Sequence, residues 1–261
     1  MNIVVLIKQV PDTNEVKIDQ ETGRIMREGL PSIINPDDKA GIEEALKIKE
    51  KNGAHVTVLS MGPPQAAAAL KEAYAMGCDE VILLTDKAFG GADTWATSTA
   101  LAAAINNLDY DLIIAGRQAI DGDTAQVGPQ TAEHLGIPSI SYVEDIKNIT
   151  DEYIEVQRQF EDRFQIIRAK FPVLITTLGE MNSPRYMRVS KIYEANSTDI
   201  VKTWTVDDIE VDRSQIGLIG SPTKVKRSFT KGAKQAGKVF EVAADEGANI
   251  IVDKLAGEFL I

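Results

Sequence analysis

The chain has 261 residues, of which 44% are apolar and 26% are charged, and its formal net charge is -11. This is the composition of an ordinary globular protein, which excludes disordered, collagen-like and low-complexity classes, and the length predicts one large domain or one domain with an appendage. The negative charge excludes nucleic acid as an expected partner, because the average field of the protein repels a phosphate backbone.

The first two-thirds of the chain alternate strand and helix signals. Short apolar runs predict buried strands, and apolar residues at helical spacing predict helices. In chain order we expect strands at 3–10, 55–60, 80–85 and 111–115, a turn-rich stretch at 11–37, and helices at 38–50, 63–77, 94–107 and 129–135. This alternation predicts a doubly wound, Rossmann-like α/β fold with a mostly parallel sheet and helices on both faces.

The pattern changes after about residue 141. Short strands at 143–149, 153–158 and 164–170 predict a small antiparallel β addition, and 173–177 predicts a strand that rejoins the main sheet. Beyond about 195 little core-building periodicity remains, and only 250–259 predicts a strand-to-helix ending. We therefore expect an α/β domain at 1–195 and an extended C-terminal arm at 196–261 that wraps a partner subunit, because a tail without its own core is otherwise unstable.

Three further features bear on location and partners. No run approaches the roughly 18 apolar residues that a membrane helix needs, so no membrane span is expected. The N-terminus lacks a signal peptide's basic region and cleavage site, and the single cysteine, Cys78, predicts a packing residue in a cytoplasmic protein. The cations clustered at 224–238 indicate either a solvated surface or a contact with an acidic partner or a nucleotide phosphate.

Ligands of open parallel sheets bind beyond the carboxyl ends of the strands, where five loops should meet. The loop at 116–129 is the most informative, because Pro129 suits the first turn of a helix and Gly128 can precede it. The start of that helix offers free N–H donors to an anion, and Arg117 adds a fixed charge with a planar donor fork. Thr124 and Gln126 add neutral hydrogen-bonding groups.

The other loops carry weaker signals. In the loop at 90–94, Asp93 or Thr94 caps the next helix, or the loop contacts a phosphate or a ribose. Asn35 and Pro36 begin the helix at 38–50, where Asp37 and Asp38 would repel phosphate, so a base or sugar is the expected contact.

Most catalytic classes find no support. We see no phosphate-loop, GxGxxG, metal-ligand or catalytic-triad pattern. His55 lies in a predicted strand and His134 in a predicted helix, and both are expected to be structural. A nucleotide site without acid–base machinery favours a carrier whose cofactor performs the chemistry.

Six segments carry a family likeness. They are VLIKQVPDT at 5–13, INPDDKAGIEEALKIKE at 34–50, SMGPPQA at 60–66, AMGCDE at 75–80, GRQAIDGDTAQVGPQTAEHLG at 116–136 and MNSPRY at 181–186. Together they resemble the beta subunits of heterodimeric electron transfer flavoproteins, and the segment at 116–136 is the most specific. The resemblance implies that 1–195 binds a nucleotide and that the arm embraces an alpha subunit.

Members of this family differ in what the beta subunit holds. Simple members hold AMP as a structural ligand. Bifurcating members hold a second FAD, which takes a hydride from NADH, sends one electron to ferredoxin or flavodoxin, and passes the other through the alpha-subunit FAD to a dehydrogenase. The segments at 127–129 and 220–223 resemble the bifurcating branch and imply FAD. A non-bifurcating carrier with AMP is the alternative, and an ATP-sensing regulator on a similar sheet is a third, which the long arm disfavours.

The resemblance also assigns residues. Those expected to bind the adenine nucleotide and pyrophosphate are Lys8, Asn35, Asp38, Met61, Gly62, Gly90, Gly91, Ala92, Thr94, Arg117, Gln118, Asp121, Gly122, Asp123, Thr124, Ala125, Gln126, Val127, Gly128 and Pro129. Those expected near the flavin ring are Thr223, Lys224 and Val225.

A second assigned set concerns partner docking. The loop that anchors an acyl-CoA dehydrogenase partner matches Met181, Asn182, Ser183, Pro184, Arg185 and Tyr186. Met181 stands where many members have Leu, and a flexible Met fits an irregular pocket equally well. A lactate-type dehydrogenase is the alternative partner, and an ordinary turn is the other interpretation of this segment.

Overall fold

The computed structural model describes residues 1–12, 17–18, 25–26, 31–224 and 237–261. The chain divides into two compact units, Met1–Lys224 and Val225–Ile261. The first unit contains a nine-stranded sheet with helices packed on it, and the described part of the second contains one helix, α7 (Ala244–Gly257).

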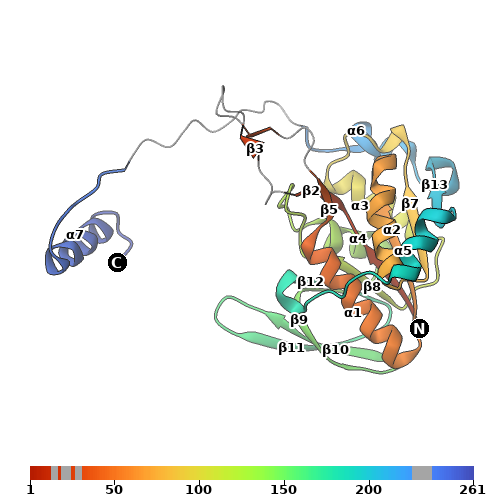
Figure 1. Cartoon of the computed structure of the whole chain (residues 1–261), viewed down its shortest axis with the longest axis horizontal. Helices are drawn as coiled ribbons and strands as arrows, with labels where there is room; N and C mark the ends of the chain where they lie inside the picture. Colours follow the sequence, from red (N-terminus) through yellow and green to blue (C-terminus); the bar gives the residue numbers. More distant parts are fainter. Residues whose placement is uncertain (13–16, 19–24, 27–30, 225–236) are drawn as a thin grey trace. The chain divides into compact units, whose positions relative to one another are not determined.

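The sheet of the first unit has the strand order β11-β10-β9-β12-β8-β1-β6-β7-β13 (Figure 1). Its strands are β1 (Asn2–Leu6), β6 (His55–Met61), β7 (Glu80–Leu84), β8 (Leu112–Gly116), β9 (Ser139–Ile149), β10 (Tyr153–Gln159), β11 (Phe164–Lys170), β12 (Val173–Thr177) and β13 (Val201–Trp204). Neighbours from β9 to β13 pair in parallel, whereas β10 pairs antiparallel with β9 and β11. The predicted fold class, a mostly parallel α/β sheet with an antiparallel addition, is confirmed.

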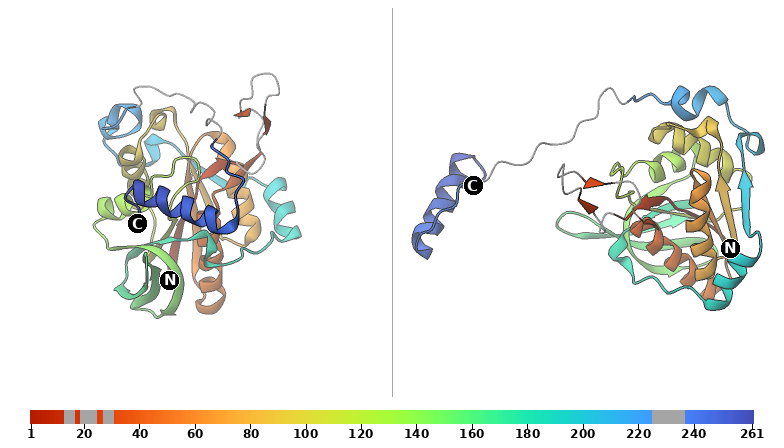
Figure 2. Two further views of the ribbon diagram at one scale, coloured as in Figure 1. Left: turned by 90° about the vertical axis from the view of Figure 1, so that its left-hand side faces the viewer. Right: turned by 45° about the horizontal axis from the view of Figure 1, so that its top comes forward.

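Helices cover both faces of this sheet. Side chains alternate between the faces along each strand, so Ile3 and Val5 of β1 enter one apolar layer and Val4 and Leu6 enter the other. The first layer contains apolar residues of α1 (Pro36–Asn52) and α2 (Ala67–Met76), and the second contains those of α3 (Thr94–Ile105) and α4 (Val127–Leu135). The fold is therefore doubly wound (Figure 2).

The N-terminal strand is shorter than predicted. β1 ends at Leu6, and β2 (Gln9–Pro11) pairs antiparallel with β5 (Ser32–Ile34) in a separate two-stranded sheet. A further pair, β3 (Lys17–Ile18) and β4 (Ile25–Met26), lies within the stretch predicted as turns. Strands of two or three residues contain too little alternation for a sequence pattern to predict them.

Residues 196–224 belong to the first unit rather than to the second. β13 extends the sheet beside β7, and Val206, Ile209 and Ile216 are buried in the layer that contains α3. The segment begins with the last residues of α5 (Val189–Ser197), at the boundary that the sequence predicts after residue 195. The apolar residues that this segment adds to the layer are separated by polar ones. They therefore produce neither helical nor strand periodicity in the sequence.

The second unit corrects one prediction directly. The strand-to-helix ending expected at 250–259 is wrong, because Ala244–Gly257 forms one helix, α7. Ile250, Ile251 and Val252 have β propensity, but the alanines and charged residues around them favour a helix. No helix among the described residues is long and apolar enough to cross a membrane.

Cys78 lies at the junction of α2 and β7. Its side chain is 2% exposed and belongs to the apolar layer under α1 and α2. Burial raises the pKa of the Cys78 thiol to about 12, so the reactive thiolate is suppressed at neutral pH. The prediction of a packing residue is confirmed.

Candidate functional site

A cavity of about 1000 Å³ opens where β1, β6, β7 and β8 end. The strand-to-helix loops after β6, β7 and β8, the residues that follow β1 and the start of α1 form its walls, as expected for a parallel sheet. The assigned cofactor residues that line it are Lys8, Asp38, Met61, Gly62, Gly90, Gly91, Ala92, Thr94, Arg117, Gln118, Gly122, Asp123, Thr124, Ala125, Gln126, Val127 and Gly128. Leu6, Leu59, Phe89 and Leu101 add apolar surface.

Other assigned cofactor residues do not line the cavity. Asn35 directly precedes α1, Asp121 lies in the loop between β8 and α4, and Pro129 lies in the first turn of α4. Thr223 donates a hydrogen bond to Asp93, which lines the cavity, and Lys224 is exposed at the end of the first unit. Val225 lies outside the described residues.

Two helices begin at the cavity wall. Asp93 caps α3 by accepting the Ala96 N–H at 3.0 Å, whereas α4 has no side-chain cap at Gln126. Thr94 joins the two helix starts by donating to Gln126 Oε1 at 3.2 Å. Because the first turn of α4 has N–H groups without intrahelical partners, this wall is suited to a phosphate group.

Asp38 ties together the ends of two strands. Its Oδ2 accepts the Lys8 N–H at 2.7 Å after β1, and its Oδ1 accepts the Gly116 N–H at 3.1 Å at the end of β8. Asn35 Nδ2 donates to the same Oδ1 at 3.0 Å. Burial raises the pKa of Asp38 to about 7, since loss of hydration outweighs these three donors. The carboxylate is thus occupied by backbone and amide donors of this chain.

Asn35 holds the loop at 116–129 in place. Its Nδ2 donates to the Gln118 carbonyl at 2.8 Å, and its Oδ1 accepts the Ile120 N–H at 3.1 Å. Its side chain therefore serves this distant loop, and does not cap α1. Within the loop, Asp123 and Ala125 have φ of 53° and 54°, a left-handed conformation that costs energy for residues other than glycine. Such local strain is typical of ligand-binding loops.

Arg117 faces both the cavity and a carboxylate. Its Nε lies 3.3 Å from Asp37 Oδ2, and its guanidinium carbon lies 6.0 Å from the centre of the Tyr142 ring. Burial raises the pKa of Asp37, and Arg117 partly offsets that effect. Asp37 Oδ1 also accepts the Gly179 N–H at 2.9 Å, after β12. The sequence did not indicate this pair, which forms only through the tertiary fold.

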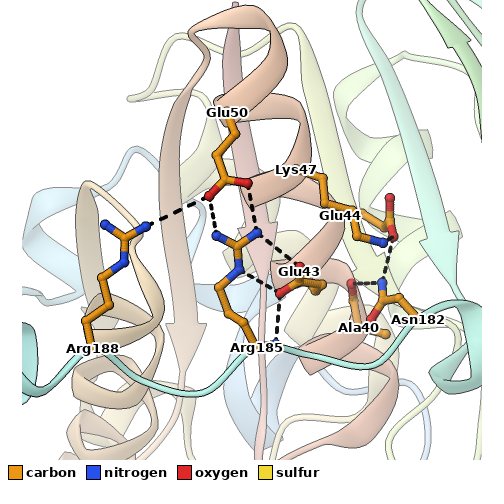
Figure 3. Close-up of polar contacts among 8 residues, drawn as sticks. All are labelled: Ala40, Glu43, Glu44, Lys47, Glu50, Asn182, Arg185 and Arg188. Atoms are coloured by element: carbon orange, nitrogen blue, oxygen red, sulfur yellow. Dashed lines mark hydrogen bonds and ion pairs between the residues drawn. The ribbon is translucent and has the colours of Figure 1, made fainter.

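The segment at 181–188 is fastened to α1 (Figure 3). The Arg185 guanidinium donates to both oxygens of Glu43, at 2.9 and 3.0 Å, and to both oxygens of Glu50, at 2.5 and 3.2 Å. Asn182 Nδ2 donates to the Ala40 carbonyl at 3.0 Å and to Glu44 Oε1 at 2.8 Å. The two carboxylates raise the pKa of Arg185 further above its usual value. Arg185 therefore supports the loop and is committed to contacts inside the chain.

The same segment and the helix that follows it, α5, present apolar side chains to solvent. Tyr186 is 97% exposed, and Val189 and Tyr193 of α5 are 82% and 76% exposed. Met181, by contrast, packs partly against the core layer of α1 and α2. Exposed apolar side chains on a fastened support are typical of protein-binding surfaces.

Replacing Arg185 with lysine should loosen this segment without unfolding the chain. A lysine cannot make the paired contacts with Glu43 and Glu50, and we expect a loss of about 1–2 kcal/mol in the free energy of unfolding. Amide exchange in peptides covering 181–188 should accelerate. Arg188→Lys is the matched control, because Arg188 lies 3.9 Å from Glu50 and is largely exposed. Equal exchange rates in the two variants would contradict the supporting role of Arg185.

Comparison with known proteins identifies the family of this chain. The electron transfer flavoprotein domain model matches residues 22–209. The electron transfer flavoprotein subunit beta of Clostridium acetobutylicum is 57% identical over 261 residues, covering 100% of both chains. The caffeyl-CoA reductase-Etf complex subunit CarD of Acetobacterium woodii is 51% identical over 264 residues, again covering 100% of both.

A more distant relative also matches over most of both chains. Protein FixA of Bradyrhizobium diazoefficiens is 40% identical over 263 residues, covering 98% of this chain and 91% of its own. The matched domain covers the loops after β6, β7 and β8 that line the cavity, and the matches to the first two relatives also cover the residues after β1. The chain therefore belongs to the electron transfer flavoprotein family, among its beta subunits.

Proposed function

We propose that this chain binds FAD in the cavity and acts as the beta subunit of an electron-bifurcating electron transfer flavoprotein. The size of the cavity carries the choice of FAD over AMP. Its volume of about 1000 Å³ lies at the upper end of the range of about 300–1,000 Å³ for small-molecule sites. A cavity of this volume has room for a dinucleotide, and this supports FAD.

The lining residues suit the parts of an adenine dinucleotide. The N–H groups of Val127 and Gly128, with Arg117, would hold the pyrophosphate. Gly90 and Gly91 allow close approach to the backbone, and apolar residues such as Phe89 offer a surface to a flat ring. When bound, FAD would supply the redox chemistry, taking a hydride from NADH and passing single electrons to ferredoxin or flavodoxin and, through an alpha-subunit FAD, to a dehydrogenase.

Names of relatives support this direction. One relative is the CarD subunit of a caffeyl-CoA reductase-Etf complex, and another is the acryloyl-CoA reductase electron transfer subunit gamma of Anaerotignum propionicum, 42% identical over 268 residues. Both names describe electron transfer with acyl-CoA reduction, and so favour this function over that of an ATP-sensing regulator. They also favour an acyl-CoA dehydrogenase-type partner over a lactate-type one at the loop 181–186.

The second unit supports an alpha-subunit partner. No residue of α7 is buried, and Ile251, Val252, Phe259 and Leu260 are exposed at or just beyond this helix. A helix with exposed apolar side chains and no core of its own requires another surface to cover it. We assign that surface to the alpha subunit, which agrees with the expected role of the arm.

Nucleotide analysis of the complex tests this function. The chain would be co-expressed with its alpha subunit, and the nucleotides released by denaturation would be counted by chromatography. Two FAD per heterodimer without AMP would support the proposal, and NADH-dependent ferredoxin reduction would then be assayed. One FAD with one AMP would contradict bifurcation and identify a simple carrier.

Arg117→Ala should weaken nucleotide retention about tenfold or more, through loss of a charge-assisted contact. Because this change also leaves Asp37 without its partner, Arg117→Lys serves as the comparison. The lysine keeps a positive charge but lacks the guanidinium fork, so its retention should be intermediate. Nucleotide release from the purified complex would be measured by fluorescence, and unchanged release from Arg117→Ala would contradict the assignment of Arg117.

A further inference from the structure

The last segment of the first unit is fastened to the rim of the cavity. We call residues 216–224 the strap and residues 89–94 the rim. Within the strap, α6 (Gly217–Gly220) contacts α3 (Figure 1) and the short helix η2 (Lys87–Phe89), whose last residue is the first residue of the rim. Ile216 is buried in the core, so the strap begins from a fixed point. No strap residue lines the cavity itself.

Backbone contacts set the strap close to the rim. The Leu218 N–H donates to the Gly90 carbonyl at 3.0 Å, and the Asp93 N–H donates to Ser221 Oγ at 2.9 Å. Ser221 Oγ in turn donates to the Gly217 carbonyl at 2.7 Å. Gly217 has a φ of 58°, and a Cβ added there would lie 2.0 Å from the Ala88 carbonyl oxygen. Only glycine permits this approach.

Asp93 is the residue that serves both segments. Its Oδ2 accepts the Thr223 N–H at 2.9 Å and the Thr223 hydroxyl at 2.7 Å. Its Oδ1 accepts the Ala96 N–H at 3.0 Å and so fixes the start of α3. Asp93 itself lines the cavity. One carboxylate therefore joins the strap, the rim and the first turn of a cavity helix.

We propose that Asp93 is a positioning residue that couples nucleotide binding in the cavity to the docked position of the strap. The proposal rests on the proposed function, namely that the cavity holds a nucleotide. A nucleotide that orders the rim also orders the acceptor of both Thr223 donors, so it stabilises the docked strap. By linkage, the docked strap stabilises the bound nucleotide by the same factor.

The coupling has a consequence for the second unit. The strap ends at Lys224, and the chain continues directly into Val225–Ile261. An occupied cavity therefore fixes Thr223, which lies two residues before that unit in the sequence. Loss of nucleotide would release Thr223.

Two positions allow the coupling to be tested in the complex with the alpha subunit. Asp93→Ser keeps a good cap for α3 but removes the acceptor of the Thr223 donors. Thr223→Val removes the hydroxyl donor, and Thr223→Ser, which keeps it, is the matched control. Amide exchange of peptides covering 216–224 would be measured with and without FAD, then with AMP, together with the rate of nucleotide release.

In the wild type and Thr223→Ser, FAD should slow exchange across the strap about fivefold or more. In Asp93→Ser this slowing should disappear and FAD release should accelerate about tenfold, with Thr223→Val between the two. If Asp93→Ser does not fold, the comparison of Thr223→Val with Thr223→Ser tests the coupling. Strap exchange that bound FAD leaves unchanged would overturn the coupling and leave the cavity assignment intact. A wild-type complex that binds neither FAD nor AMP would overturn the proposed function and the coupling with it.

Discussion

Gly116→Ala should empty the cavity and destabilise the first unit. A Cβ added to Gly116 would lie 2.0 Å from Asp38 Oδ1, 2.8 Å from Asp38 N and 2.9 Å from Asp37 Cβ. The atoms in its way belong to the first turn of α1, which packs on the sheet and cannot move alone. We expect a loss of about 3 kcal/mol in the free energy of unfolding, because overpacking of this kind displaces backbone.

Gly116→Ala should also deplete the purified complex of nucleotide. Displaced Asp38 can no longer hold the Lys8 N–H and the Gly116 N–H together, so the walls of the cavity after β1 and β8 separate. Nucleotide content of the purified complex should fall below about a tenth of the wild-type value, given that each 1.4 kcal/mol is a factor of ten in binding.

Gly122→Ala is the matched control for this experiment. Gly122 belongs to the same loop and lines the same cavity, yet a Cβ added there would meet no atom within 4 Å. The free energy of unfolding should therefore stay near the wild-type value in Gly122→Ala. If the two alanine variants unfold alike, the tight packing at Gly116 does not stabilise the walls of the cavity.

The core of the fold could be predicted from the sequence because parallel strands are buried on both faces. Runs such as 3–7 and 111–115 are nearly free of polar residues, and the segments between such runs have apolar residues at helical spacing. The sequence also predicts that the loops after these strands meet, since the carboxyl ends of parallel strands share one edge of the sheet. The boundary at 195 was harder, because β13 is a short edge strand with two exposed residues.

The contacts that shape the site could not be predicted. Asp38 meets Gly116 across 78 positions of sequence, and Arg185 meets Glu43 across 142. Acidic residues in the first turn of a helix usually face solvent, so Asp37 and Asp38 gave no sign that both would be buried. Asp93 was expected as a helix cap, which it is, but its second oxygen binds a residue 130 positions away. Such pairings depend on the tertiary fold alone.

Asp38→Asn should show how much the buried Asp38 side chain and its three hydrogen bonds contribute to the stability of the fold. The two carboxyl oxygens of Asp38 accept three N–H donors, and the oxygen that carries a proton below about pH 7 can still accept one of them. An asparagine has one acceptor oxygen and would point its NH2 group, which cannot accept, at another donor. We expect a loss of about 2–4 kcal/mol in the free energy of unfolding near pH 5, together with loss of nucleotide. Asp121→Asn is the control, because it removes only the partly exposed pair with Lys8, which should cost less than about 1 kcal/mol.

The cost of Asp38→Asn should depend on pH in a definite direction. Burial raises the pKa of Asp38 from 3.8 to about 7, so the folded chain holds a proton that the unfolded chain has released. The stability linked to this proton is fully present below pH 3.8 and is lost as pH rises through about 7. An asparagine does not titrate, and other groups titrate in both proteins. The difference between wild type and Asp38→Asn should therefore shrink between pH 5 and pH 8.

Urea unfolding of both proteins at several pH values in this interval measures that difference. A difference that stays constant would mean that Asp38 is ionised throughout, with its three donors outweighing the loss of hydration. A difference that shrinks would mean that ionisation of the buried Asp38 near pH 7 destabilises the folded chain. Because Asp38 joins the strand ends that form the cavity wall, nucleotide release from the wild type should then accelerate over the same interval, while release from Asp121→Asn follows the wild-type curve.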